Sequence, residues 1–211
     1  MSRSSLVVAL SVLVLISCTA AALADDINPP PWRGQSGTTF TKYEFPTPNF
    51  TPPPDIEVKP YGQASAEVNS CGPNEWYAEW AGRQGVWRLS GNISVTIPNS
   101  PVANTYKDIQ VQLTWARQEP GACPIVGEDR FDVVAQKIQE IHLDETWMHT
   151  TYVIRIMPNP VWERVYIEGP VLADELVIDT TCAFVTPEPS SLVMLAGSML
   201  GLAGLLWRRR R

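Results

Sequence analysis

The sequence predicts an all-β protein, a sandwich or barrel built from short strands. Two stretches carry this prediction, because apolar and polar residues alternate in them and such a strand has one dry face and one wet face. The apolar positions are Ile93, Val95 and Ile97 in the first stretch and Ile109, Val111, Leu113 and Trp115 in the second. Similar short runs, divided by turn residues, lie at 63–68, 76–80, 150–157, 162–168 and 175–181.

Residues 1–24 are predicted to be a secretory signal peptide that takes no part in the fold. Arg3 provides a short basic region, residues 6–16 are apolar, and residues 22–24 form a small-residue cleavage site, so signal peptidase is an expected partner. Alternatively, cleavage of the signal peptide directly before Cys18 would leave this cysteine as the lipidated first residue of a lipoprotein. Cleavage after Ala24 is preferred, because a second anchor beside the one at the other end of the chain would be redundant.

Residues 25–60 are predicted to form a proline-rich arm before a β domain at 61–185. Clustered prolines favour an extended chain, with one edge strand expected over 38–45. A purely flexible spacer would not carry five aromatic residues, so part of the arm is expected to lie across the domain. These aromatic residues are Trp32, Phe40, Tyr43, Phe45 and Phe50.

The charge of the chain bears on its partners. The formal net charge is −6, but removal of Arg3 and of the four terminal arginines leaves 11 basic residues against 22 acidic ones. The exported part then has a charge near −11. So acidic a surface argues against binding to nucleic acid or to anionic polymers, and it favours neutral sugars or cations as ligands.

Residues 131–143 fit two structures. Phe131, Val134, Ile138 and Ile141 have helical spacing, whereas a strand through the same segment would place Lys137 on its dry face. Periodicity alone therefore favours a helix. The end of the domain favours the other interpretation.

Residues 157–169 (MPNPVWERVYIEG) and 172–179 (LADELVID) resemble the last strands of jelly-roll carbohydrate-binding-module-like domains. The resemblance implies an antiparallel jelly-roll-like β-sandwich, in which residues 131–143 form a strand with a bulge, and we therefore predict a strand there. In such modules an Asp just before the last strand often helps to hold a structural calcium ion, and Asp174 occupies the matching position. A single carboxylate without an EF-hand-like cluster is a weak metal signal, so a solvated turn residue is preferred and no other cofactor is expected.

Tryptophan packs equally well against sugar rings and in a sandwich core. Alternation places Trp115 in the core. Trp76 and Trp80 are four residues apart and share a face of an unbroken strand, so they are the candidate sugar-binding platform, although core packing is the preferred interpretation for them as well.

No catalytic motif is found, and we expect a protein that is not an enzyme. His142 and His149 are the only histidines, and their spacing matches no zinc-site pattern. No nucleophile motif or phosphate-binding loop is present. A glycoside hydrolase needs only two facing carboxylates, so that activity stays open as an alternative.

The cysteines allow at most one internal disulfide. Once Cys18 has left with the signal peptide, Cys71, Cys123 and Cys182 remain. In an antiparallel jelly roll of eight strands, Cys123 follows the fourth strand and Cys182 ends the eighth, so both lie at the same end of the sandwich. We therefore predict a bridge between Cys123 and Cys182, worth about 4 kcal/mol in the chain-entropy model.

The C-terminal segment, residues 186–211, has three consecutive parts. A Pro-Glu-Pro triplet at 187–189 precedes eighteen uncharged residues, 190–207, and four arginines end the chain. Eighteen residues at helical rise span roughly 27 Å, enough to cross the hydrocarbon core of a bilayer. The arginines are disfavoured from crossing, so they stay cytoplasmic and residues before the triplet lie on the far side.

These three parts resemble the PEP-CTERM sorting signal of bacteria with an outer membrane. The resemblance implies recognition by an exosortase, cleavage near the triplet, and transfer from the inner membrane to the cell surface or exopolysaccharide matrix. The sorting residues would be Pro187, Glu188, Pro189, Arg208, Arg209, Arg210 and Arg211.

Three functions are compatible with an exported β-sandwich that carries this signal. A structural or adhesive role at the cell surface or in the matrix is preferred. A neutral-polysaccharide-binding or calcium-dependent binding module is the first alternative, and an extracellular glycoside hydrolase is the second.

Overall fold

The computed structural model describes residues 25–69, 75–101 and 106–183, a part of the chain with thirteen strands and no α-helix. Within these ranges no helix is long and apolar enough to cross a membrane. The predicted signal peptide, the predicted transmembrane helix at 190–207 and Cys71 lie outside the described residues. The prediction of an all-β protein is confirmed for the part of the chain that the structure describes.

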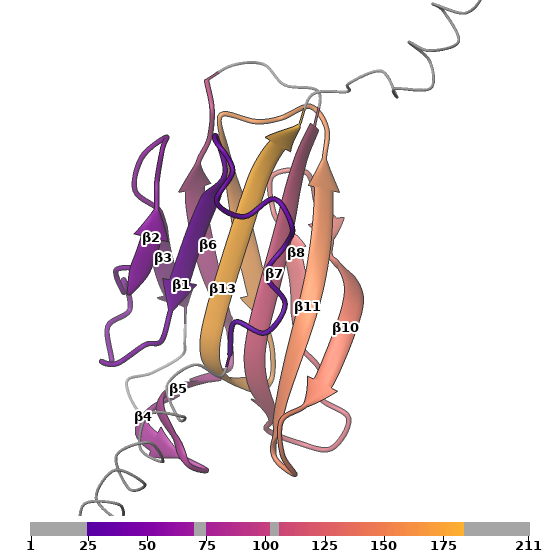
Figure 1. Cartoon of the computed structure of the whole chain (residues 1–211). Helices are drawn as coiled ribbons and strands as arrows, with labels where there is room; N and C mark the ends of the chain where they lie inside the picture. The colour runs from indigo at the N-terminus through magenta and orange to yellow at the C-terminus, as the bar shows by residue number, and fades with distance from the viewer. Residues whose placement is uncertain (1–24, 70–74, 102–105, 184–211) are drawn as a thin grey trace, which may run out of the picture.

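The strands form two antiparallel sheets. Sheet A has the order β10-β11-β7-β13-β1-β2, and the hairpin of β4 and β5 joins it where β5 pairs with β13 (Figure 1). Its strands are β1 (Thr39–Tyr43), β2 (Ile56–Val58), β4 (Trp76–Trp80), β5 (Arg83–Leu89), β7 (Tyr106–Arg117), β10 (Gln136–His142), β11 (Trp147–Ile156) and β13 (Val171–Ala183).

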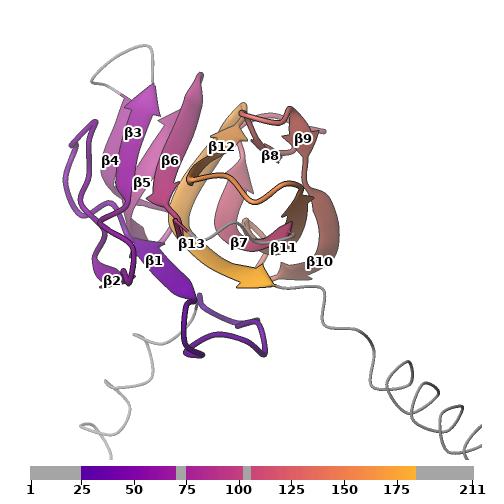
Figure 2. The same cartoon turned by 90° about the horizontal axis from the view of Figure 1, so that it is seen from above.

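Sheet B has the order β3-β6-β12-β8-β9 and lies over sheet A as a second layer (Figure 2). Its strands are β3 (Ser65–Asn69), β6 (Asn92–Pro98), β8 (Ile125–Glu128), β9 (Val133–Val134) and β12 (Trp162–Glu168). The two layers make the described part of the chain a β-sandwich.

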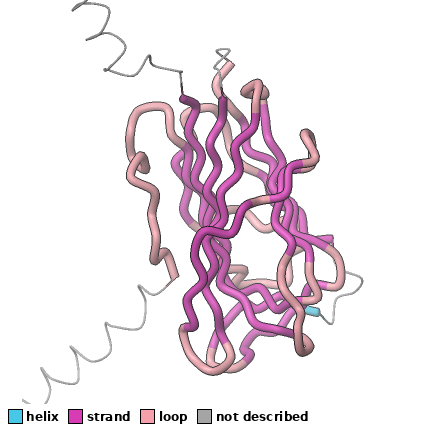
Figure 3. The backbone as a smooth tube through the Cα atoms, turned by 90° about the vertical axis from the view of Figure 1, so that its right-hand side faces the viewer, coloured by secondary structure: helices cyan, strands magenta, loops and turns pink. Residues whose placement is uncertain are grey.

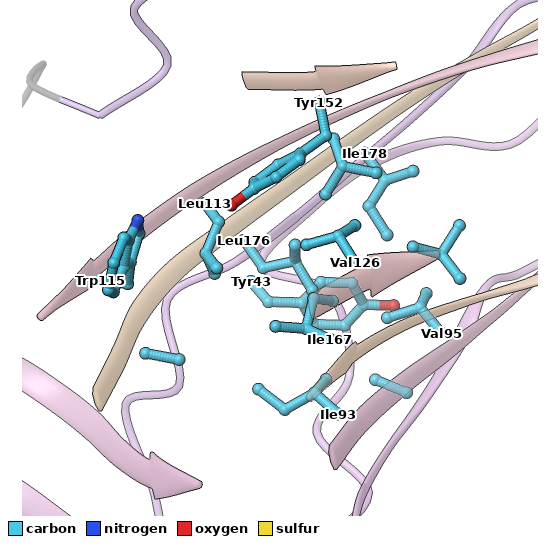
Figure 4. Packing of buried hydrophobic residues seen from close by; sticks show 14 of the residues in the cluster. Tyr43, Ile93, Val95, Leu113, Trp115, Val126, Tyr152, Ile167, Leu176 and Ile178 are labelled. Atoms are coloured by element: carbon cyan, nitrogen blue, oxygen red, sulfur yellow. The ribbon is translucent and has the colours of Figure 1, made fainter. Parts of the chain in front are cut away.

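The hydrophobic core lies between the two sheets, where residues of both inner faces pack together (Figure 4). Every apolar position that alternation assigned to a dry face in 93–97 and 109–115 is at most 2% exposed. Trp115 is fully buried among them. Alternation identified these buried positions correctly because the inner face of a sandwich excludes water along the whole length of a strand.

The strand predicted over residues 131–143 is confirmed, as β9 and β10. The pairing of β10 with β11 shifts register between Lys137 and Gln139, which is the irregularity expected of a bulge. β10 is an edge strand and most of its residues are exposed. The Lys137 side chain therefore lies outside the hydrophobic core, and it forms a surface ion pair with Glu140.

Three strands were not predicted from the sequence: β2, β5 and β8. β5 contains Gly85, and its apolar residues are consecutive because Val86 and Trp87 are buried on opposite faces in two different clusters. Gly85 has a φ of +76°, and a Cβ there would lie 2.5 Å from the carbonyl oxygen of Phe45. This close approach of two backbones requires glycine.

The arm is part of the fold. β1 was expected at an edge, but it lies between β13 and β2, and Tyr43 and Phe45 are fully buried. Residues 25–38 run across the outer face of sheet A, as the indigo segment in Figure 1 and the loop beside the sheet in Figure 3 show. Part of the arm thus lies across the domain, as the aromatic residues indicated.

Hydrogen bonds and ion pairs hold the arm to sheet A. Arg33 bridges Asp26 of the arm and Asp179 of β13, and Asn28 donates to the Gln112 side chain of β7 (2.8 Å). The outward residues of β7, which alternation had assigned to a wet face, are consequently at most 7% exposed. These residues are Gln110, Gln112 and Thr114.

The predicted Cys123–Cys182 disulfide is wrong in this structure, because both residues are free thiols. Cys182 is opposite Lys107 at the start of β7, whereas Cys123 follows Arg117 at the end of the same strand. Ten residues of strand, about 34 Å, separate these two positions. The strand count failed because β8, directly after Cys123, was not counted.

Candidate functional site

The outer face of sheet B presents polar and aromatic side chains to solvent. Side chains of β12 alternate strictly: Glu163, Val165 and Ile167 are buried, whereas Trp162, Arg164 and Glu168 are exposed. β3 and β6 alternate in the same way, so the outward residues of three neighbouring strands share one surface.

The strand register arranges these outward residues in rows. Ser65, Thr96 and Arg164 form one row across β3, β6 and β12. The next rows are Glu67, Ser94 and Tyr166, and then Asn69, Asn92 and Glu168. Within the rows, Asn69 Nδ2 donates to Asn92 Oδ1 (3.0 Å) and Arg164 Nε donates to Thr96 Oγ1 (3.3 Å).

Two adjoining hollows follow these rows. One has a volume of about 530 Å³ and extends from the rows toward residues 51–53, and the other has about 450 Å³ and extends toward Asp129 and Asp132. Both are lined by Glu67, Ser94 and Arg164, so they are continuous. We call this surface the sheet B groove.

Trp162 is the first residue of β12, and its ring lies beside Arg164, which lines the groove. It is 38% exposed, and its ring lies 5.0 Å from the Arg130 guanidinium carbon and 5.8 Å from that of Arg164. Two arginines beside one ring hold it in place through cation–π contacts. Tyr166, four residues further along the same face, is about 13 Å away at the rise of a strand.

The groove has more acidic than basic groups. Glu67, Glu168, Asp129 and Asp132 line its second hollow, and Arg164 is the basic residue that lines both. Burial, and then the negative charge of Glu168, raise the pKa of Tyr166, so its phenol stays protonated and can donate a hydrogen bond. The surface therefore offers hydroxyl, amide and carboxylate groups beside an aromatic ring.

The predicted platform of Trp76 and Trp80 does not form one surface. Trp76 packs against the main core and donates from Nε1 to the Phe45 carbonyl (3.0 Å). Trp80 packs against the second hydrophobic cluster, edge-on to Trp147 at 5.4 Å. Both are half-buried, in agreement with the preferred core interpretation.

Asp174, the candidate calcium ligand, lies at a register shift in β13, where it is 7% exposed and accepts hydrogen bonds from Arg83. It is therefore not the solvated turn residue that was preferred. Burial raises its pKa to about 6, against the lowering effect of Arg83. No group of three or more His, Cys, Asp or Glu side chains suited to a metal ion occurs within 25–69, 75–101 and 106–183.

The two histidines differ in their exposure to solvent. His142 is exposed on β10, whereas His149 is 1% exposed on β11. Burial lowers the pKa of His149, and its ring nitrogens lie within hydrogen-bond distance of Thr114 Oγ1 (3.0 Å) and Gln112 Oε1 (3.3 Å). His149 is thus a neutral residue of the layer between sheet A and the arm.

The residue that sequence reasoning missed is Trp162. Its signal was available, because Val165 and Ile167 fix the dry face of 162–168 and thereby place Trp162, Arg164 and Tyr166 on the other face. Trp76 and Trp80 were the predicted platform because they lie on the same face of one strand. That position alone does not determine whether the face is buried or exposed.

Comparison with protein-family models gives one finding, at the C-terminus. Residues 185–211 match the model of the PEP-CTERM protein-sorting motif. Comparison with curated proteins gives no match for the chain. The chain therefore carries a PEP-CTERM sorting signal, which an exosortase recognises, and the protein is exported and sorted to the cell surface or extracellular matrix.

Proposed function

We propose that this protein is an adhesive component of the cell surface or extracellular matrix that binds neutral polysaccharide through the sheet B groove. The observation that carries the proposal is Trp162, an exposed ring fixed beside a groove lined with hydroxyl, amide and carboxylate groups. The resemblance of the last strands to jelly-roll carbohydrate-binding modules points to the same function and to a jelly-roll arrangement of the two sheets.

The chemistry of the groove favours a neutral sugar. An aromatic face packs against the apolar face of a pyranose ring, and the side chains of Asn69, Asn92 and Ser94 can exchange hydrogen bonds with sugar hydroxyls. An acidic polymer would meet Glu67 and Glu168 and a chain of strongly negative net charge. A span of about 13 Å between Trp162 and Tyr166 suits an extended chain rather than a single sugar ring.

The test is an array of neutral oligosaccharides probed with the exported protein, with and without calcium. We expect binding that Trp162→Ala weakens by about tenfold or more, because loss of a central aromatic contact typically costs over 1 kcal/mol. The matched control is Tyr106→Ala, which removes a ring stacked under Arg155 (4.3 Å) on sheet A. Equal effects of the two variants, or the absence of binding to any neutral glycan, would contradict the proposal.

The same assay separates binding from hydrolysis. Four carboxylates line the second hollow, so a bound glycan should also be followed for release of reducing ends. Glycan that is bound and stays intact supports an adhesive protein. Release of reducing ends that depends on one of these carboxylates would replace the proposal with a glycoside hydrolase.

A further inference from the structure

A lysine, a carboxamide and a carboxyl group meet in the interior, away from the sheet B groove. Lys107 is the second residue of β7 in sheet A, Glu163 lies on β12 in sheet B, and Asn99 directly follows β6. Lys107 and Glu163 are 0% exposed and Asn99 is 6% exposed. All three continue inner faces of the sandwich, in line with Ile109, Val165 and Ile97 respectively.

The Lys107 amine lies close to both of the other side chains. Lys107 Nζ lies 2.8 Å from Asn99 Oδ1 and 3.0 Å from Glu163 Oε1. Reacting groups that are held at about 3 Å in a fixed orientation gain a large rate advantage over free groups.

Hydrogen bonds fix the orientation of the Asn99 amide. Its Nδ2 donates to the Pro160 carbonyl oxygen (2.7 Å) and to Asn159 Oδ1, both of which are acceptors. Its Oδ1 accepts from the Ser100 backbone N–H (2.8 Å) and from the Cys182 thiol (2.9 Å) as well as from Lys107. Donors at the oxygen would stabilise negative charge there if a nucleophile attacked the amide carbon.

The carboxyl group has the properties of a proton carrier. Burial raises the pKa of Glu163 to about 7, against the lowering effect of Lys107. Neither Glu163 oxygen has a hydrogen-bond partner in the described part of the chain, although Oε1 lies at ion-pair distance from Lys107 Nζ. A fully buried carboxylate whose oxygens lack hydrogen-bond partners is costly, so Glu163 is a suitable group to accept a proton and to give it back.

We propose that Lys107 and Asn99 join in an intramolecular isopeptide bond and that Glu163 carries the proton for the reaction. Once one Lys107 proton has passed to Glu163, the uncharged Nζ attacks Asn99 Cγ, and the new Nζ–Cγ bond replaces the Cγ–Nδ2 bond. Glu163 gives its proton to Nδ2, which leaves as ammonia, and takes one from Nζ. The atoms balance without an oxidant, a metal ion or a further reactant, and the carboxyl group ends protonated, as it was when the amine attacked.

The position of the bond suggests what it does. It would join β7 of sheet A covalently to the residue that follows β6 of sheet B, at one end of the core. The two sheets are otherwise held by apolar packing between their inner faces. A cross-link that forms after folding would thus keep the layers from separating under load outside the cell.

Intact-mass spectrometry of the purified, folded chain tests the proposal. We expect a mass lower than that of the processed sequence by one molecule of ammonia, and a proteolytic peptide in which Asn99 and Lys107 are joined. Glu163→Gln keeps both reacting residues and removes the proton carrier, so most molecules of that variant should retain the ammonia. The matched control Lys137→Arg, in a surface pair with Glu140, should lose ammonia as the unsubstituted protein does.

The outcomes are separable. If the intact mass of the folded, unsubstituted protein shows no loss of ammonia, the proposal is overturned regardless of the results for the variants. Loss of ammonia that persists in Lys107→Arg, or a product at Asn99 that hydroxylamine opens to a hydroxamate, would indicate a succinimide at Asn99 and would also overturn the proposal. If Glu163→Gln fails to fold, the cross-linked peptide from the unsubstituted protein and its absence from Lys107→Arg decide the question.

Discussion

At the scale of single residues, the two neighbouring carboxyl groups of Asp174 and Glu175 make stability depend on pH. Burial raises their pKa values to about 6 and about 7, although Arg83 and Lys42 lie beside them. The folded state therefore binds protons more tightly than the unfolded state, whose carboxyl groups titrate near pH 4. Their contribution is fully present below that pH and is lost as the pH rises through 6 to 7.

We accordingly expect the free energy of unfolding to fall between about pH 4.5 and pH 7.5, as measured by urea denaturation at a series of pH values. Glu175→Gln should make this slope shallower, because an amide does not titrate. Glu168→Gln, an exposed position on β12, serves as the control and should leave the slope unchanged. A slope that is the same in all three proteins would show that other groups set the pH dependence.

Single residues also show which burial assignments the sequence could predict and which it could not. Ile109 and Val111 were assigned correctly because alternation records which face of a strand excludes water. The same rule assigned Gln112 to water, yet the arm covers it. Alternation describes one strand and its two faces. It carries no information on a segment 80 residues away in the sequence that crosses the polar face.

At the scale of elements, Arg33 is one of the residues that tie the arm to sheet A. Arg33 donates to Asp179, which is fully buried, and to Asp26 of the arm itself. Removal of one partner of a buried pair leaves an uncompensated charge. We expect Arg33→Ala to lower the free energy of unfolding by about 3 kcal/mol, as measured by chemical denaturation.

The control for this prediction is Arg155→Ala. Arg155 also pairs with an aspartate, Asp108, through two hydrogen bonds, but its side chain is 60% exposed. An exposed pair contributes about 0–1 kcal/mol, so this variant should be nearly as stable as the unsubstituted protein. Similar losses in both variants would mean that burial beneath the arm adds nothing to the Arg33 contacts.

The strands that were missed, β2, β5 and β8, are either short or buried on both faces. β5 departs from simple alternation because the β4–β5 hairpin packs against two clusters, and β8 is only four residues long. A short or doubly buried strand lacks the period-2 signal on which the prediction depends. The strand over 131–143 was predicted correctly only through the jelly-roll resemblance, since an exposed edge strand such as β10 is under little pressure to alternate.

At the scale of the whole molecule, the two outer faces of the sandwich differ. Residues 25–38 run across the outer face of sheet A (Figure 1) and make polar and ionic contacts with it. On the outer face of sheet B, by contrast, Trp162, Arg164 and Glu168 are exposed. Because of the arm, the outer face of sheet B is the more accessible of the two faces.

The sorting signal leads to a prediction about the mature protein. Cleavage near the Pro-Glu-Pro triplet at 187–189 should remove the apolar stretch and the arginines, so that mass spectrometry of native material finds no peptide from 192–211. Replacement of Glu188 by Gln should block this processing and leave membrane insertion unaffected, because the apolar stretch that drives insertion is unchanged. The matched control is Glu175→Gln, which changes the same residue type outside the signal and should be processed normally. Equal processing of the Glu188 variant, or an intact tail on protein at the cell surface, would mean that residues 186–211 act as a plain membrane anchor rather than as a site of cleavage.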